Sequence, residues 1–244
     1  MLILALGLAA CSGETEAELS STETTSPSAE ATTTIPAEQA SPDAAVAEVD
    51  ADGTTTIDQS QLEAQLATMP TGTLTPEDEE GLLLMREEEK LAHDVYVALY
   101  DMWQVQIFFN ISDAETTHTD AVLTLLDRYG LDDPADDNPE GVFTNPELQE
   151  LYNDLVAQGS ESLVEALKVG ALIEDLDIYD LRSLETDVAD IAQVYDSLEK
   201  GSRNHMRSFI KNLEQQGETY TPMFLTPEEF EEIVSTPTER ENNG

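Results

Sequence analysis

The sequence predicts an all-α fold with four long helices and a long connection between the second and the third. Two observations carry this prediction. Apolar residues recur every three or four positions through four segments, as they do on the buried face of a helix. These segments begin and end at strong helix signals, and the alternation typical of strands is nearly absent. The pattern favours a helical bundle with one crossover connection.

The helix boundaries follow from capping residues and turn signals. The first long helix begins at Thr75-Pro76-Glu77, where a Thr cap precedes a Pro and acidic residues, and its apolar pattern continues to Trp103. The second ends at Gly130, before the turn-rich stretch LDDPADDNPEG. The remaining predicted ranges are 105–129 for the second long helix, 144–159 for a short helix within the long connection, 160–182 and 187–216 for the third and fourth long helices, and 225–234 for a short C-terminal helix.

Each of the four long helices carries polar residues in the middle of its apolar stripe. They are Glu89 on the first helix, Glu115 and His118 on the second, Glu174 on the third, and Ser202 and His205 on the fourth. A charged group at a core position is costly unless it is paired or binds a metal. Four such interruptions at comparable depth indicate one shared site. Carboxylates and imidazoles in the core of a bundle are the ligands of dinuclear iron or manganese sites.

A family resemblance is visible at these residues. AETTH (114–118) supplies a Glu-x-x-His motif, and EEKLAHDVY (88–96) resembles the first-helix pattern of ferritin-like di-iron proteins. A closer resemblance, over about residues 75–235, is to the ferritin-like prokaryotic family known as the domain of unknown function 2202. It is carried by LMREEEKLAHDVY, GVFTNPELQELY, LKVGALIEDLDIYDL and GSRNHMRSF. The resemblance implies a ferritin-like four-helix domain, which we expect over residues 73–236, but it does not define an activity. Residues 237–244 are expected to form a disordered tail.

The expected cofactor is iron, as a di-iron or mononuclear site, with manganese as the alternative. The expected metal ligands are Glu89, Glu115, His118, Glu174 and His205, with Asp177 as a further candidate and Tyr96 and Ser202 as residues that support the ligands. The standard ferritin-like pattern has a second Glu-x-x-His on the fourth helix, whereas this sequence has Ser202 in the place of that glutamate. Asp177 is a partial replacement for it and Glu199 a weaker one, so the number of metal ions stays open.

Each candidate ligand also has an ordinary structural interpretation. These interpretations are a capping box for Ser112 and Glu115, a solvated charge run for Glu89 within REEEK, an ion pair with Arg203 or Arg207 for Glu174, and a core histidine with satisfied hydrogen bonds for His205. His93 is expected at the surface or beside the ligands.

The N-terminal residues resemble a bacterial lipoprotein signal. MLILALGLAACSG combines an apolar run, small residues and the single cysteine, although the usual positively charged start is absent. The resemblance implies a signal peptide over residues 1–10, a lipid on Cys11 that anchors the protein to the membrane, and a place in the cell envelope outside the cytoplasm. An ordinary secretory signal is the alternative. Residues 11–72 are rich in Ser, Thr, Glu, Ala and Pro and are expected to form a disordered acidic tether, with a short helix over 57–69 as an option.

The formal net charge of −42 argues against nucleic acid and anionic lipid headgroups as partners. Two classes of function remain. The first is a metal-dependent redox protein that acts on iron itself, on oxygen or peroxide, or on an unknown small molecule. The second is a metal-free helical surface module that binds a protein partner. A storage cage is a third idea with weaker support. Metal-dependent stability discriminates between the first two.

Overall fold

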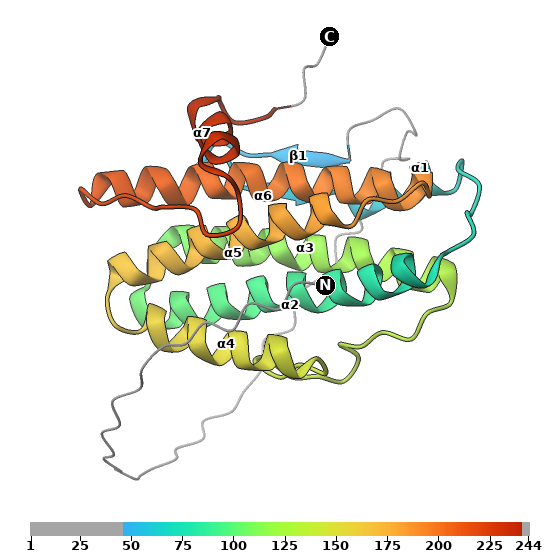
Figure 1. The fold of residues 1–244 in the computed structure, drawn as a ribbon, viewed down its shortest axis with the longest axis horizontal. Helices are drawn as coiled ribbons and strands as arrows, with labels where there is room; N and C mark the ends of the chain where they lie inside the picture. The colour runs from blue at the N-terminus through green and yellow to red at the C-terminus, as the bar shows by residue number, and fades with distance from the viewer. Residues whose placement is uncertain (1–45, 241–244) are drawn as a thin grey trace, which may run out of the picture. The chain divides into compact units, whose positions relative to one another are not determined.

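The computed structural model describes residues 46–240, and this part of the chain is mostly helical (Figure 1). The element bounds are β1 Ala47–Val49, β2 Thr55–Ile57, α1 Gln59–Leu66, α2 Pro76–Trp103, α3 Gln106–Tyr129, α4 Pro146–Gly159, α5 Leu163–Ser183, α6 Ala189–Gln215 and α7 Pro227–Ser235. The predicted helical class is confirmed, and the long helices α2, α3, α5 and α6 lie close to the predicted ranges.

The ends of the helices have the physical causes that the sequence indicates. Thr75 Oγ1 accepts a hydrogen bond from Asp78 N at 3.1 Å, and Asp78 accepts one from Thr75 N at 2.8 Å, so α2 begins with a full capping box. Gln104 adopts a left-handed conformation with φ 52° and ends α2, so that α3 returns antiparallel to it. Gly130, with φ 70°, ends α3 in the same way.

The four long helices pack against one another. α2 packs along α3 and α5 packs along α6, while contacts between α3 and α6 and between α2 and α5 join the two pairs (Figure 1). The long connection between α3 and α5 contains α4, which covers α2 and α5, and α7 packs on α6. The stripes that the sequence places inside therefore face a common interior.

A polar layer divides this interior into two apolar clusters. One cluster includes Val95 and Leu99 of α2 and Phe209 of α6. The other includes Leu82 of α2 and Leu198 of α6. On α2, α3 and α6, the segment that separates the residues of one cluster from those of the other carries the predicted polar residues. The polar side chains are thus enclosed between apolar ends, which raises the energetic demand that each be paired.

The prediction of a disordered tether over 11–72 is wrong for residues 46–66. β1 and β2 form an antiparallel hairpin that lies on α3 and α6, and α1 packs on α3. Ile57, Leu62 and Leu66 are buried in the second apolar cluster. The polar average composition hides these few apolar residues, which are spaced so that one strand and one helix face bury them. The predicted short helix over 57–69 is confirmed as α1, and residues 11–45 lie outside the described part.

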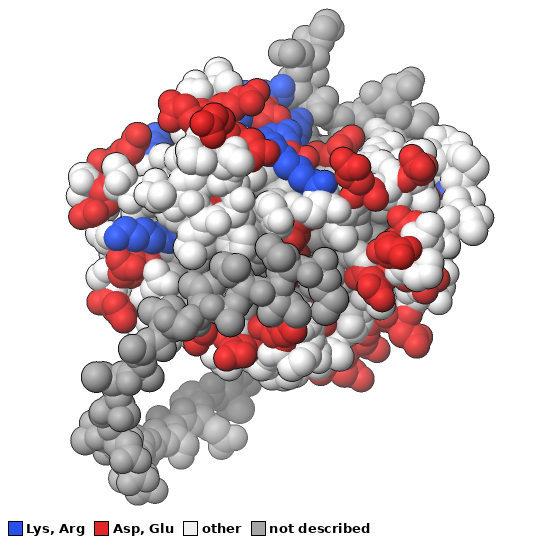
Figure 2. Space-filling model, viewed as in Figure 1, with Lys and Arg blue, Asp and Glu red and all other residues white. Residues whose placement is uncertain are grey.

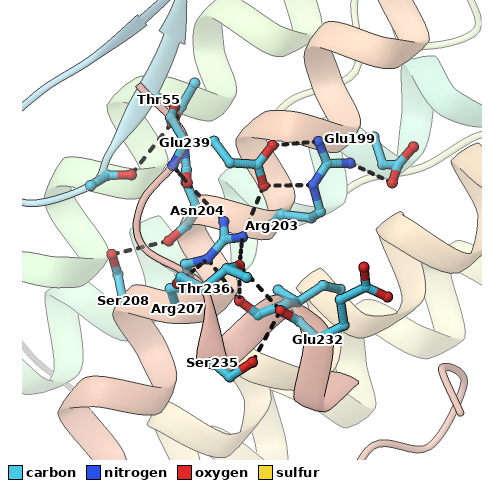
Figure 3. A network of polar contacts seen from close by, with 12 residues as sticks. Thr55, Glu199, Arg203, Asn204, Arg207, Ser208, Glu232, Ser235, Thr236 and Glu239 are labelled. Carbon is cyan, nitrogen blue, oxygen red and sulfur yellow. Dashed lines mark hydrogen bonds and ion pairs between the residues drawn. The ribbon is translucent and has the colours of Figure 1, made fainter. Parts of the chain in front are cut away.

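The prediction of a disordered tail over 237–244 is likewise wrong up to residue 240. Glu239 forms ion pairs with Arg203 and Arg207 of α6, as Figure 3 shows. The Arg240 guanidinium donates to the carbonyl oxygens of Val49 and Asp50, which lie on and beside β1. The residues after α7 therefore connect α6 to the N-terminal hairpin, and residues 241–244 lie outside the described part.

Acidic side chains are spread over the visible face of the molecule, with few basic ones among them (Figure 2). This matches the excess of 52 acidic over 10 basic residues in the whole chain. Within residues 46–240, none of the helices has the length and apolar character needed to cross a membrane.

Candidate metal centre

The polar layer contains the predicted ligands from all four long helices. Its members are Glu89 and Tyr96 of α2, Glu115 and His118 of α3, Glu174 and Asp177 of α5, and Ser202 and His205 of α6. All are buried except Asp177, which is half-buried. The helical spacing that predicted a shared face therefore brings these residues together.

Glu115 lies at the centre of the layer, between two histidines. Its Oε1 lies 3.0 Å from His205 Nδ1, and its Oε2 lies 2.8 Å from His118 Nδ1. The two imidazole rings stack with their centroids 5.4 Å apart. One ligand atom from each of these three residues lies within 4.8 Å of the others, so that Glu115, His118 and His205 are a group that could hold a metal ion.

Glu89 adds a second carboxylate beside His118. Glu89 Oε2 lies 3.5 Å from His118 Nδ1. Within residues 46–240, neither His118 Nδ1 nor Glu89 Oε1 has a hydrogen-bond partner. The approach of Glu115 Oε2 to His118 Nδ1, at 2.8 Å, lacks hydrogen-bond geometry. Buried polar atoms without partners are rare in native structures and call for an explanation such as a bound ion.

Two further carboxylates complete the layer from α5. Tyr96 donates a hydrogen bond of 2.6 Å to Glu174 Oε1, and that oxygen lies 3.8 Å from His205 Nδ1. Ser202, the residue in the place of the expected glutamate, donates to Asp177 Oδ2. Tyr96 and Ser202 thus each donate a hydrogen bond to a carboxylate of the layer. Asp177 lies where it could partly replace the missing glutamate.

Burial and mutual charge set the protonation of the layer. Burial raises the pKa of Glu89 to about 7, although His118 opposes the shift. Burial also raises the pKa values of Glu174 and Asp177, and nearby carboxylates add to both shifts. For Glu115, burial acts in the same direction, but His118 and His205 outweigh it and lower the pKa.

The pKa of His118 responds to the same neighbours. Burial disfavours the charged ring, but the Coulombic attraction of Glu115, aided by Glu89, outweighs burial and raises the pKa of His118 well above its ordinary value. A metal ion bound at His118 Nδ1 would compete with a proton for the same lone pair.

The alternative interpretation of Glu89 as part of a solvated charge run in REEEK is wrong, because all three glutamates are buried. Glu87 accepts hydrogen bonds from the backbone N–H groups of Thr144 and Asn145, which begin the segment leading into α4. Burial and the nearby Asp180 raise the pKa of Glu88 well above its ordinary value. Each glutamate thus faces a different partner, which a charge run in the sequence does not indicate.

The structure also tests the other ordinary interpretations of the candidate ligands. Ser112 lies inside α3 and donates to Phe109 O, so it does not cap the helix. Glu174 forms no ion pair with Arg203 or Arg207, because these arginines bind Glu239. Glu199, the weaker substitute for the missing glutamate, forms an ion pair with Arg203, as Figure 3 shows. His93 hydrogen-bonds Asp94 and lies outside the polar layer.

Sequence reasoning missed two residues that contact the histidines. Thr55 of β2 contacts both imidazole rings through its main chain. Gly201 of α6 lies so close to His118 that a Cβ atom there would stand 2.5 Å from the ring. The glycine before Ser202 was a readable signal for close approach. No such signal marks Thr55 in the sequence, because its contacts with the two histidines use only the backbone.

The fold and the site together define a helical protein with a buried carboxylate–histidine group that could hold a metal ion. Residues 78–237 match the family described as "Uncharacterized protein domain (DUF2202)", and the chain belongs to this family.

A curated relative and a solved structure are similar to this chain. Uncharacterized protein MJ0754 of Methanocaldococcus jannaschii is 52% identical over 180 residues, covering 73% of this chain and 97% of the relative. The crystal structure of hypothetical protein MJ0754 from Methanococcus jannaschii matches with a TM-score of 0.70 and 52% identity, covering 70% of this chain and 99% of that one.

Proposed function

We propose that the polar layer is an iron site in a ferritin-like four-helix bundle, and that the protein acts in iron or oxygen/peroxide redox chemistry. The observation that carries the proposal is the buried His118 Nδ1, which faces Glu115 and Glu89 without a hydrogen bond to either. A cation at this point would satisfy the imidazole nitrogen and both carboxylates together.

The donor set fits iron. Carboxylates and imidazoles suit iron and manganese, whereas soft metals prefer sulfur. Cys11 is the single cysteine of the chain and lies outside the described residues. His118 Nε2 donates to Thr55 O at 2.9 Å, which is the outer hydrogen bond that a ligating histidine normally makes. Manganese is the alternative metal with the same preferences.

The residues that would hold the metal are Glu115, His118 and His205, with Glu89, Glu174 and Asp177 nearby. Glu115 directs one oxygen toward each histidine and would hold a metal together with them. Because Ser202 stands in the place of a glutamate, α6 supplies one carboxylate fewer, and a second metal ion would have fewer ligands. A bound iron would supply one-electron chemistry toward oxygen or peroxide. The apolar clusters on either side would keep bulk water from the site.

A metal-free helical module that binds a protein partner is the second candidate. One observation favours it: several groups of the layer already have partners within the protein. Tyr96 donates to Glu174, and Ser202 donates to Asp177. In this case protons would neutralise the remaining carboxyl groups, in keeping with the raised pKa values of Glu89 and Glu174.

We also propose that the protein is anchored to the membrane by lipid on Cys11, outside the cytoplasm. The support is the sequence MLILALGLAACSG alone, which lies outside the described residues. Membrane fractionation of cells that express the chain, beside a Cys11→Ser variant, tests this. The anchor predicts that the parent is found with membranes and that the variant is not. An equal distribution of the two proteins would contradict it.

The iron proposal is tested by metal content per chain. The chain is loaded with ferrous iron without oxygen, desalted and measured by mass spectrometry, beside Glu115→Ala, His118→Ala and His93→Ala variants. We expect one or two irons in the parent and in His93→Ala, whose histidine lies outside the layer. We expect loss of iron in the other two variants, with a lower melting temperature. A folded parent that retains no metal would favour the metal-free module.

A further inference from the structure

One residue of the N-terminal hairpin binds both histidines of the polar layer. The Thr55 N–H group donates a hydrogen bond of 3.1 Å to His205 Nε2. The Thr55 carbonyl oxygen lies 2.9 Å from His118 Nε2 and accepts a hydrogen bond from it. Thr55 itself is fully buried. The two imidazoles are therefore held at their outer nitrogens by the two peptide groups of a single residue.

These two contacts place the protons differently on the two rings. A carbonyl oxygen only accepts, so His118 Nε2 must carry its proton. An N–H group only donates, so His205 Nε2 must be the acceptor and a neutral His205 carries its proton on Nδ1. His205 Nδ1 then donates to Glu115 Oε1 at 3.0 Å. His118 Nδ1 is therefore available to a metal ion, whereas His205 Nδ1 is not.

A network of side chains fixes the position of Thr55. Asn204 Nδ2 donates to Thr55 Oγ1 at 2.9 Å, and Asn204 Oδ1 accepts from the backbone N–H of Glu239 at 2.8 Å (Figure 3). Arg207 also donates to Asn204 Oδ1, and it pairs with Glu239. The residues after α7 and the residues before α1 therefore meet over α6, immediately outside the histidines.

The next strand residue with the same orientation supports this placement. The Ile57 N–H group donates to Thr117 Oγ1 of α3 at 2.8 Å. Thr55 and Ile57 thus both direct their amides away from β1 and toward the long helices. β2 is tied to α3 through Thr117 and His118, and to α6 through Asn204 and His205.

We propose that the main chain of Thr55 makes the two histidines unequal: His118 binds metal through Nδ1, while His205 keeps its Nδ1 proton and orients Glu115. This inference rests on the proposed metal site and refines it. Thr55 and His205 are positioning residues in this account. Ser202 supplies no carboxylate, and the nearby Glu174 and Asp177 already accept hydrogen bonds from Tyr96 and Ser202, so the site takes one metal ion per chain.

The proton positions can be read directly by NMR, because the chain has only three histidines. Long-range ¹H–¹⁵N spectra of the ¹⁵N-labelled full chain, metal-free and loaded with diamagnetic zinc, report which ring nitrogens carry protons. His93→Gln and His205→Gln variants assign the signals. We expect His205 with a protonated Nδ1 and a bare Nε2 in both states, and His118 with a protonated Nε2.

Two variants of Thr55 connect these proton positions to the main chain. Thr55→Pro removes the N–H group, so His205 Nε2 loses its donor and the ring should gain the Nε2–H form. Thr55→Val keeps both peptide groups, loses only the side-chain hydrogen bonds to Asn204 and Gly53, and should leave the Nδ1–H form in place. A parent spectrum with a proton on His205 Nε2, or with zinc on His205 Nδ1, would overturn the inference even if Thr55→Pro fails to fold.

Zinc content separates this inference from the proposed function. One zinc retained by His205→Gln and lost by His118→Gln supports the unequal roles. Equal loss in both variants, from a parent that binds metal, overturns the unequal roles and leaves the metal site standing. A parent that binds neither zinc nor iron refutes the metal site, and with it the ligand role of His118. The metal-free spectrum would still decide the role of Thr55.

Discussion

Gly201 lies on α6 against the ring of His118. A Cβ atom at this position would stand 2.5 Å from His118 Cε1 and 2.9 Å from Nε2, closer than real contacts allow. His118 is fully buried, so its ring has little room to move away. The absence of a side chain at Gly201 therefore positions the candidate ligand.

The Gly201→Ala substitution tests this close contact, because the contact reverses the expected sign of its effect on stability. At an ordinary site inside a helix, this change stabilises a protein by up to about 1 kcal/mol. Here we expect destabilisation of about 1–3 kcal/mol from overpacking, together with weaker metal retention. Urea unfolding and metal content measure both effects, and Lys211→Ala on the exposed face of α6 is the control. A stabilised Gly201→Ala variant that retains metal would contradict the role of Gly201.

Tyr96 tests the polar layer from α2. Tyr96→Phe removes the donor to Glu174 and leaves a buried carboxyl group with one partner fewer. We expect a loss of about 1–3 kcal/mol in the free energy of unfolding, measured in urea without metal. Tyr195→Phe is the matched control, because Tyr195 is buried but shows no hydrogen bond from its hydroxyl within the described residues. Equal effects of the two changes would show that the hydroxyl of Tyr96 is unimportant.

At the residue scale, helical periodicity predicts which polar side chains face inward. Glu89, Glu115, His118, Glu174 and His205 all interrupt apolar stripes, and all are buried in the structure. The interaction partners of the buried glutamates were harder to predict from the sequence. The burial of Glu87 and Glu88 depends on where the residues before α4 and the end of α5 lie in space, which local periodicity does not encode.

At the element scale, the hairpin and α1 are integral parts of the fold. Ile57→Ala leaves a cavity under β2, where Ile57 is 3% exposed, and should destabilise the chain by about 2–5 kcal/mol. Thr56→Ala, at the neighbouring half-buried position, is the control and should cost much less. Chemical unfolding of the full chain provides the measurement. If Ile57→Ala left stability unchanged, residues 46–66 would be a tether after all.

Helix starts and stops were predictable because they rest on local chemistry. The Thr75 cap, the left-handed Gly130 and the Thr226 cap of α7 each act within a few residues of chain. The hairpin was not predictable in this way, because its strands are three residues long and it is stabilised by contacts with α3 and α6. Such contacts join residues far apart in the sequence.

At the scale of the whole molecule, the layer couples stability to pH. The pKa of Glu89 rises from its ordinary 4.5 to about 7 in the folded state, so folded chains hold more protons than unfolded ones between these values. Glu174 and Asp177 are shifted upward as well. The raised pKa of His118 adds stability that is lost as pH rises through its folded value.

The metal-free protein should therefore lose stability as pH rises from about 5 to 8. The lowered pKa of Glu115 acts only below its ordinary value of 4.5, outside this window. Urea unfolding at several pH values measures the slope, and Glu89→Gln should flatten it. With metal bound the slope should reverse, because metal and protons compete for the same atoms. A metal-free protein whose stability rises across this range would contradict the account.

The measurement that tests the central claim most directly is anomalous X-ray diffraction from crystals of the full chain loaded anaerobically with ferrous iron. Data collected on both sides of the iron absorption edge locate iron without reference to function. The account predicts one strong peak within bonding distance of His118 Nδ1, Glu115 and Glu89. A polar layer without anomalous density in well-ordered crystals, with iron only at surface carboxylates, would contradict it.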